Sequence, residues 1–184
     1  MQTPAGPDFR PIHDVPDDWT GWVRGRLIGD AQLVAPLSQR PCAYYKLVVE
    51  RNNPQPQPPE RIAYQARGQS FVIEDVSGRA LVDPDLALVE VDYDRELQVD
   101  GRGRLPQAVV ELLRRLDVVG EQVIVREGVL AIGETIAVHG RMVHDVDDEL
   151  GQVGRPRRLR VRAPGRDRVF ISERSVEHWD LAAR

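Results

Sequence analysis

Cys42 is the residue with the clearest potential for chemistry, because a thiolate is both a nucleophile and a metal ligand. It is the one cysteine in the sequence, so no disulfide can form within the chain. A catalytic thiolate needs an electropositive, partly exposed setting and a nearby base, and no feature of the sequence supplies a histidine partner. We therefore predict a buried thiol that packs as a small apolar residue. A thiol enzyme built on Cys42 is kept as an alternative.

Asp75, Ser77 and Asp83 form a second group, since carboxylates at a turn suit Ca²⁺ or Mg²⁺. The same residues are also typical of turns in which Asp and Ser side chains bond to backbone amides. We predict the turn, with Gly78 at positive φ. It remains the second place to look for chemistry.

Two histidines and an acidic run complete the candidates for metal binding. His139 and His144 are five residues apart, which places them on opposite faces of a regular strand. The run 145–149 lacks the glycine and the distal glutamate of an EF-hand loop, and is read as a solvated turn. We predict no metal, no cofactor and no catalytic residue, and hence a protein that is not an enzyme.

Arginines gather near the end of the sequence and give its sharpest local charge bias. They could contact lipid headgroups, or nucleic acid if aromatic side chains lay beside them, or they could form a solvated hairpin. Aromatic residues make up 5% of the chain, which disfavours nucleic acid because base stacking needs aromatic platforms. The arginines are Arg155, Arg157, Arg158, Arg160, Arg162, Arg166 and Arg168. As candidate partner-binding residues we select the first five of them together with Tyr44 and Tyr64.

Composition restricts the classes of protein. The chain has 184 residues, 29% of them charged, with a net charge of −4, so it has no global attraction to nucleic acid or anionic lipid. Residues 1–18 lack the apolar segment of a signal peptide, and no window is apolar enough to cross a membrane. These features predict a cytoplasmic protein, with peripheral membrane association still possible.

Short strands bounded by Gly or Pro dominate the predicted secondary structure. Alternation predicts strands at 19–34, 42–51, 61–67, 70–75, 80–83, 86–93, 122–126, 134–143, 158–162 and 168–172. The segment 52–60 is proline-rich and cannot pair in a sheet, and 94–105 is read as a surface loop. The last two strands are expected to form a hairpin across Pro164-Gly165.

One helix is expected to begin near Pro106, a good first-turn residue, and to end at Gly120. Its apolar stripe should face the core, and a short helix is expected to end near Ala183. The stripe consists of Val109, Val110, Leu112, Leu113 and Leu116. The predicted fold is mainly β: a small antiparallel, OB-like barrel or sandwich with one packed helix. We expect a flexible arm over 1–18 and a single domain over 19–184.

Three sequence blocks resemble the GIDE domain, also called the "beside a membrane" domain, of mitochondrial E3 ubiquitin ligases and bacterial proteins. The matching residues are Pro41, Cys42, Tyr44 and Tyr45; Phe71, Asp75, Ser77, Gly78, Val82, Asp83 and Pro84; and Glu127 with Gly133. The resemblance covers roughly residues 22–178 and implies structural roles for these positions.

The resemblance implies a binding role without catalysis. With one cysteine and four histidines, the chain cannot supply the about eight ligands of a RING zinc domain, so ligase activity does not carry over. It also lacks the transmembrane helices that flank the domain in the family. We therefore predict a non-catalytic protein-interaction module, able to act beside a membrane assembly through the 54–59 loop and the arginine-rich hairpin. An OB-like nucleic-acid binder is the alternative from another class.

Overall fold

The computed structural model describes residues 8–29, 32–53, 57–84, 87–99, 105–118, 121–145, 158–162 and 168–173. Their contacts divide the chain into two compact units, whereas the sequence suggested one domain over 19–184. The barrel unit comprises Met1–Gly29, Ser70–Glu90 and Gly133–Arg184. The inserted unit comprises Asp30–Gln69 and Val91–Ile132, and so arises from two insertions into the barrel sequence.

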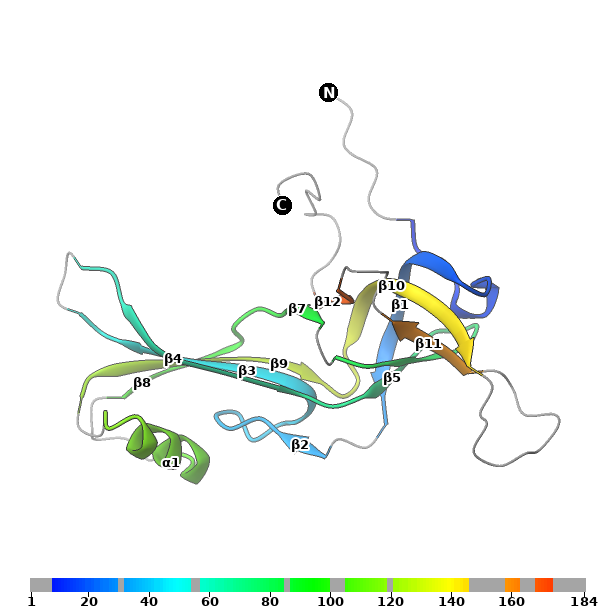
Figure 1. The fold of residues 1–184 in the computed structure, drawn as a ribbon. Coiled ribbons are helices and arrows are strands. Elements are labelled where there is room, and N and C mark those ends of the chain that lie inside the picture. The colour runs from blue at the N-terminus through cyan, green and yellow to red at the C-terminus, as the bar shows by residue number, and fades with distance from the viewer. Residues whose placement is uncertain are drawn as a thin grey trace. The chain divides into compact units, whose positions relative to one another are not determined.

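Five strands of the barrel unit pair in a closed ring (Figure 1). They are β1 (Trp19–Ile28), β5 (Phe71–Glu74), β6 (Arg79–Val82), β10 (Thr135–Asp145) and β11 (Arg158–Arg162). The ring order is β1-β5-β6-β11-β10 and back to β1, with β6 and β11 parallel and the other pairs antiparallel. The predicted mainly-β, OB-like barrel is therefore confirmed.

Alternating sequence explains the barrel strands. In β1, Val23 and Leu27 are fully buried, while Arg24 and Arg26 are exposed. Buried apolar residues of the same kind recur around the ring, and these are Ile73, Ala80, Val82, Ile136, Val138, Met142 and Val161. At Gly140 a Cβ atom would lie 2.5 Å from a Val161 side-chain carbon, so only glycine allows β11 to approach this closely.

The last two strands do not form the expected hairpin. β12 (Phe170–Ser172) pairs with β10 and, in parallel, with β7 (Leu88–Glu90), whereas β11 pairs with β10 and β6. The long β10 thus offers separate stretches of one edge to two short strands. The prediction was wrong because proximity in sequence was taken as pairing, and a ring needs β11 to bridge β10 and β6.

The N-terminal segment is packed rather than flexible over residues 8–18, which corrects the expected arm. Phe9 forms a bridge to Trp22, and the short 3₁₀ helix η1 (Ile12–Asp14) follows. Ile12 and Val15 are each 3% exposed. Residues 1–7 lie outside the described part of the chain.

The inserted unit is an antiparallel sheet with one helix (Figure 1). Its strands are β2 (Leu33–Val34), β3 (Pro41–Arg51), β4 (Glu60–Gly68), β8 (Arg95–Val99) and β9 (Val123–Ala131). β3 is central: β9 lies on one side of it and β2 and β4 on the other, and β8 extends the sheet beyond β9. β8 corrects the expected surface loop over 94–105 at residues 95–99, since a polar, alternating segment is enough for a strand at a sheet edge, and residues 100–104 lie outside the described part.

Helix α1 (Gln107–Arg115) begins after Pro106, as predicted. Val109, Leu112 and Leu113 are buried and pack with Leu47, Val49, Val118, Val123 and Val125 as one core cluster. The helix ends before Gly120, because Asp117 adopts a left-handed φ of 55° and the Val118 amide donates to the Leu113 carbonyl at 3.2 Å. This pattern is a helix C-cap with Asp where glycine is usual.

Some predictions fall on residues outside the described part: most of the 145–149 turn, the C-terminal helix, and 54–56 in the proline-rich segment. Glu60, expected in that loop, is the first residue of β4. None of the helices in the described part has the length and apolar character needed to cross a bilayer.

Candidate functional site

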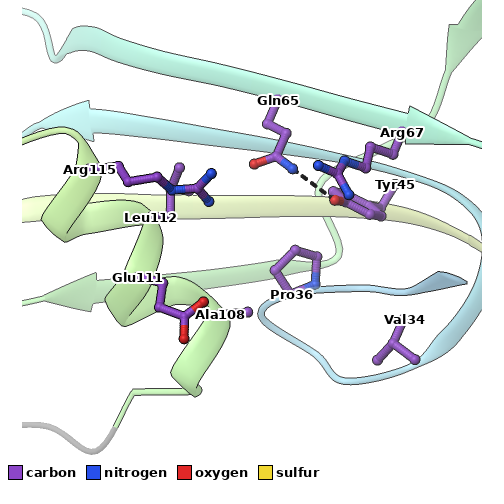
Figure 2. Close-up of a pocket in the computed structure, with 9 residues that line it drawn as sticks. All are labelled: Val34, Pro36, Tyr45, Gln65, Arg67, Ala108, Glu111, Leu112 and Arg115. Atoms are coloured by element: carbon purple, nitrogen blue, oxygen red, sulfur yellow. Dashed lines mark hydrogen bonds between the residues drawn. The ribbon is translucent and has the colours of Figure 1, made fainter.

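A pocket of about 230 Å³ lies between α1, β4 and the chain that follows β2, entirely within the inserted unit. Figure 2 shows the side chains that line it. They are Val34 and Pro36 from β2 and the following loop, Tyr45 from β3, Gln65 and Arg67 from β4, and Ala108, Glu111, Leu112 and Arg115 from α1. The helical residues recur every three or four positions, so they share one face of α1.

A tyrosine hydroxyl forms the polar part of the pocket wall. Tyr45 is 4% exposed, and Gln65 Nε2 donates a hydrogen bond to its Oη at 2.9 Å (Figure 2). Burial raises the pKa of Tyr45, although the Arg67 charge and the Gln65 hydrogen bond oppose the rise, so the hydroxyl is protonated at neutral pH. The Tyr45 oxygen accepts a hydrogen bond from Gln65. The Tyr45 O–H group can also donate one, and no described residue accepts it.

Two arginines face the pocket from opposite walls. In Figure 2 the side chains of Arg67 and Arg115 extend toward one another. Neither forms an ion pair with a carboxylate of the described residues. Glu111 also lines the pocket and accepts from Gln107 Nε2 at 3.1 Å. The pocket thus combines two unneutralised guanidinium groups, a phenol donor and one carboxylate with an apolar floor.

A buried carboxylate fixes the loop that supplies Pro36. Glu127 is 0% exposed, and its oxygens accept from the amides of Leu37 at 2.6 Å and Ser38 at 2.9 Å. The Ala35 amide donates to the Arg40 carbonyl at 2.9 Å, which closes the loop. Glu127 therefore acts on the pocket indirectly, by holding one of its walls.

Strand β4 borders the pocket and leaves one edge of the sheet unpaired. Within the described chain it pairs with β3 and with no other strand. The Gln69 amide donates to the Ala43 carbonyl at 2.9 Å, and hydrogen bonding alternates along an antiparallel pair. The backbone groups of Arg67 and Gln65 therefore face β3. Those of Tyr64, Ala66 and Gly68 face outward, where a further strand could bond to them.

The predicted arginine cluster is only partly described. Arg155 and Arg157 lie outside the described residues, and Arg158 is described only as part of the β11 backbone. Arg160 is half-buried and Arg162 is exposed, and both have interactions within the protein. These arginines belong to the barrel unit, whereas Tyr44 and Tyr64 belong to the inserted unit.

The two candidate tyrosines differ in exposure. Tyr44 is 8% exposed; burial and a hydrogen bond with Tyr64 raise its pKa. Its ring is therefore no platform for stacking. Tyr64 is 54% exposed and lies on the opposite face of β4 from the pocket-lining Gln65 and Arg67, because adjacent side chains alternate.

Cys42 is fully buried and packs with Ala35, Tyr45, Val129 and Ala131. This burial confirms the predicted apolar setting and removes the exposure that the thiol-enzyme alternative requires. Pro41, beside it, is exposed at the start of β3.

The turn between β5 and β6 has the predicted hydrogen bonds. Asp75 accepts from the amides of Ser77 at 2.7 Å, Gly78 at 2.8 Å and Ile12 at 2.9 Å, and from the Ser77 hydroxyl at 2.6 Å. Burial alone would raise the Asp75 pKa, but these bonds outweigh it and hold the pKa below its ordinary value. The expected positive φ at Gly78 is wrong: in the described chain the positive-φ glycines are Gly29 and Gly133.

The remaining motif residues have structural settings. Phe71, Val82 and Pro84 are buried, Asp83 is exposed, and Gly133 turns the chain between β9 and β10 with a φ of 94°. His139 packs on Trp22 with ring centroids 5.0 Å apart, whereas His144 lies 3.6 Å from Asp17, so the structure does not bring the two histidines together.

Sequence reasoning missed Gln65, Arg67 and Arg115. Two patterns in the sequence could have indicated a site. The strand 61–67 follows a proline-rich loop and carries polar residues at alternate positions. In α1, positions 108, 111, 112 and 115 recur at helical spacing and so share one face. What joins these two stretches is the packing of α1 on the sheet, which no local pattern shows.

Comparison of the sequence and the structure with known proteins found no matching family model, no matching curated protein and no matching solved structure.

Proposed function

We propose that the protein is a non-catalytic interaction module that binds an extended segment of a partner protein along the free edge of β4. The observation that carries this proposal is the unpaired edge of a nine-residue strand beside an open pocket. In strand addition, main-chain hydrogen bonds supply affinity, and pockets for alternate side chains supply specificity. The inserted unit has both an unpaired strand edge among the described residues and a pocket beside it.

The edge has features that limit indiscriminate pairing. Long edge strands promote aggregation unless charges or prolines interrupt them. β4 is preceded by Pro58 and Pro59, and it carries the exposed residues Arg61 and Arg67. An edge protected in this way can remain open for a selected partner.

The resemblance to GIDE domains supports the same class of function, since it implies a substrate- or partner-binding module without ligase activity. We extend the proposal to a partner within a membrane-associated assembly, with the protein itself acting in the cytoplasm. The chain's own contribution would be recognition alone.

Nucleic-acid binding is the second candidate, and the OB-like ring order favours it, because such barrels bind oligonucleotides across their second and third strands. The burial of Tyr44 counts against it, since it removes one of the two aromatic platforms on which that reading depended.

A display library of linear random peptides, panned on the purified protein, tests the proposal. We expect wild type to enrich peptides that share a motif, and Ala66→Pro to enrich none. Proline at position 66 removes an outward-facing amide without removing a β3–β4 hydrogen bond. Ala66→Val is the matched control, because it keeps the amide and should select the same motif.

Amide hydrogen exchange on wild type gives a second readout that does not depend on the folding of Ala66→Pro. A selected peptide should slow exchange at Tyr64, Ala66 and Gly68. Enrichment of no motif, or of the same motif by a folded Ala66→Pro variant, would overturn the proposal. Binding of a labelled 20-residue oligo-dT that weakens steeply between 50 and 200 mM salt would favour nucleic acid instead.

A further inference from the structure

We infer that the pocket beside β4 binds the side-chain carboxylate of an aspartate or glutamate in the extended segment that pairs with β4. This inference rests on the proposed function and specifies the chemistry of the partner. It assigns direct contact roles to Tyr45, Arg67 and Arg115, which line the pocket together.

The geometry of strand addition directs alternate side chains of the partner toward the pocket. An added strand lies roughly 4.8 Å from β4, with every second side chain on the same face as Gln65 and Arg67. That is the face on which the pocket lies, bounded by α1. One side chain of the partner therefore reaches between β4 and α1 while its backbone pairs with Tyr64, Ala66 and Gly68.

The donors of the pocket suit an anionic acceptor. The guanidinium groups of Arg67 and Arg115 have no carboxylate partner among the described residues, and the Tyr45 proton has no acceptor there. Both arginines are exposed, so water solvates them in the free protein, but hydrogen bonds from arginine to a carboxylate are among the strongest in proteins. A carboxylate can accept hydrogen bonds from all three groups, and it has no donor of its own that would need an acceptor.

The charge balance favours a carboxylate over a phosphate. The two arginines and Glu111 leave the pocket with a net charge of +1. A carboxylate neutralises this charge, whereas a phosphate group, at about −1.5 to −2, exceeds it and is repelled more strongly by Glu111 than a carboxylate is. The apolar walls formed by Pro36, Ala108 and Leu112 suit the methylene groups that join a carboxylate to its backbone.

The test compares the motifs that peptide libraries yield on wild type, on the double variant Arg67→Gln/Arg115→Gln and on the matched control Arg114→Gln. Arg114 is exposed on the same helix but does not line the pocket. We expect wild type and the control to select Asp or Glu at one fixed position, and the double variant to lose that preference.

Synthetic peptides then measure the effect. Replacing the selected acidic residue by its amide should weaken binding to wild type about tenfold or more, and binding to the double variant less than twofold. Phosphoserine at the same position should bind more weakly than the carboxylate. A motif without an acidic position, an unchanged acidic preference in the folded double variant, or tighter binding of phosphoserine would overturn the inference.

The outcomes separate the two proposals. If wild type selects a motif that Ala66→Pro loses but that has no acidic residue, strand addition stands and the carboxylate assignment fails. If no linear peptide is selected, or Ala66→Pro selects as wild type does, the proposed function fails and the inference fails with it.

Discussion

In the barrel unit, each of the five ring strands has a neighbour on both sides, whereas in the inserted unit β4 has, among the described residues, a neighbour on one side only. Closure pairs each ring strand with two ring neighbours, and the stretch of β10 that β11 does not cover is paired with β12. In the sheet of the inserted unit, the outward-facing edge of β4 can still pair with another strand. The difference is the reason why we propose the recognition surface in the inserted unit, where a strand edge is unpaired among the described residues, and not in the closed ring.

Each unit also uses one carboxylate to hold an irregular segment. Asp75 binds the β5–β6 turn to the N-terminal segment, and Glu127 binds the loop that carries Pro36. Asp75 is partly buried, whereas Glu127 is fully buried. Because loss of a hydrogen-bond acceptor costs more where water cannot replace it, the two sites should differ in the size of their effects.

The largest effect is expected for Glu127→Ala. This change leaves the amides of Leu37 and Ser38 without an acceptor and creates a cavity, and should lower the free energy of unfolding by about 3 to 5 kcal/mol. Denaturant unfolding measures it. Glu60→Gln, an exposed ion-pair residue, serves as control and should change stability by less than about 0.5 kcal/mol. A loss no larger than that of the control would show that Glu127 does not hold the loop.

Asp75→Ala should lower the free energy of unfolding by about 2 to 3 kcal/mol, because it removes the acceptor of several amides. Its native pKa is held below the ordinary value, so this stabilisation is present above the unfolded-state pKa, about 3.9. It is lost as pH falls through the lower native pKa.

Denaturant unfolding between pH 7 and pH 2 checks both parts of this prediction. Wild type should lose stability more steeply on acidification than Asp75→Ala does. The neighbouring Glu74→Gln, which removes an exposed ion pair with Arg79, should retain nearly the full wild-type pH dependence. Parallel pH profiles for wild type and Asp75→Ala would contradict the assignment.

Glu111→Gln should act on recognition and leave stability within about 0.5 kcal/mol, since the side chain is exposed. Removing this negative charge raises the net positive charge of the pocket. Binding of a selected acidic peptide should therefore tighten about two- to fivefold. Fluorescence polarisation measures the effect, with Asp117→Asn as a charge-matched control outside the pocket. Weaker binding by Glu111→Gln would mean that Glu111 contacts the peptide directly.

The smallest effect is expected at the end of α1, where Asp117 occupies a left-handed conformation. Asp117→Gly should stabilise the protein by about 0.5 to 1 kcal/mol, because glycine adopts this φ without steric cost. Thermal unfolding tests this, and Asp117→Ala should instead be neutral or destabilising. If alanine stabilised as much as glycine, the cause would lie in charge rather than in backbone conformation.

Local sequence patterns predicted what depends on near neighbours. The alternation in β1, the Pro106 helix start and the Asp75–Ser77 turn each depend on residues within a few positions of one another, and the structure has all three. The apolar flanks of Cys42 likewise predicted its burial. The mainly-β class follows from many such local signals added together.

Tertiary structure alone decided how distant segments meet. β11 pairs with β6 rather than with β12, and residues 8–15 pack because Asp75, 63 positions from Ile12, accepts its amide. The pocket joins Arg67 and Arg115, which no spacing relates. Pairing and packing between remote segments depend on which apolar faces can be buried together. A local pattern determines that a face exists, and only the folded chain determines what covers it and which edge is left open.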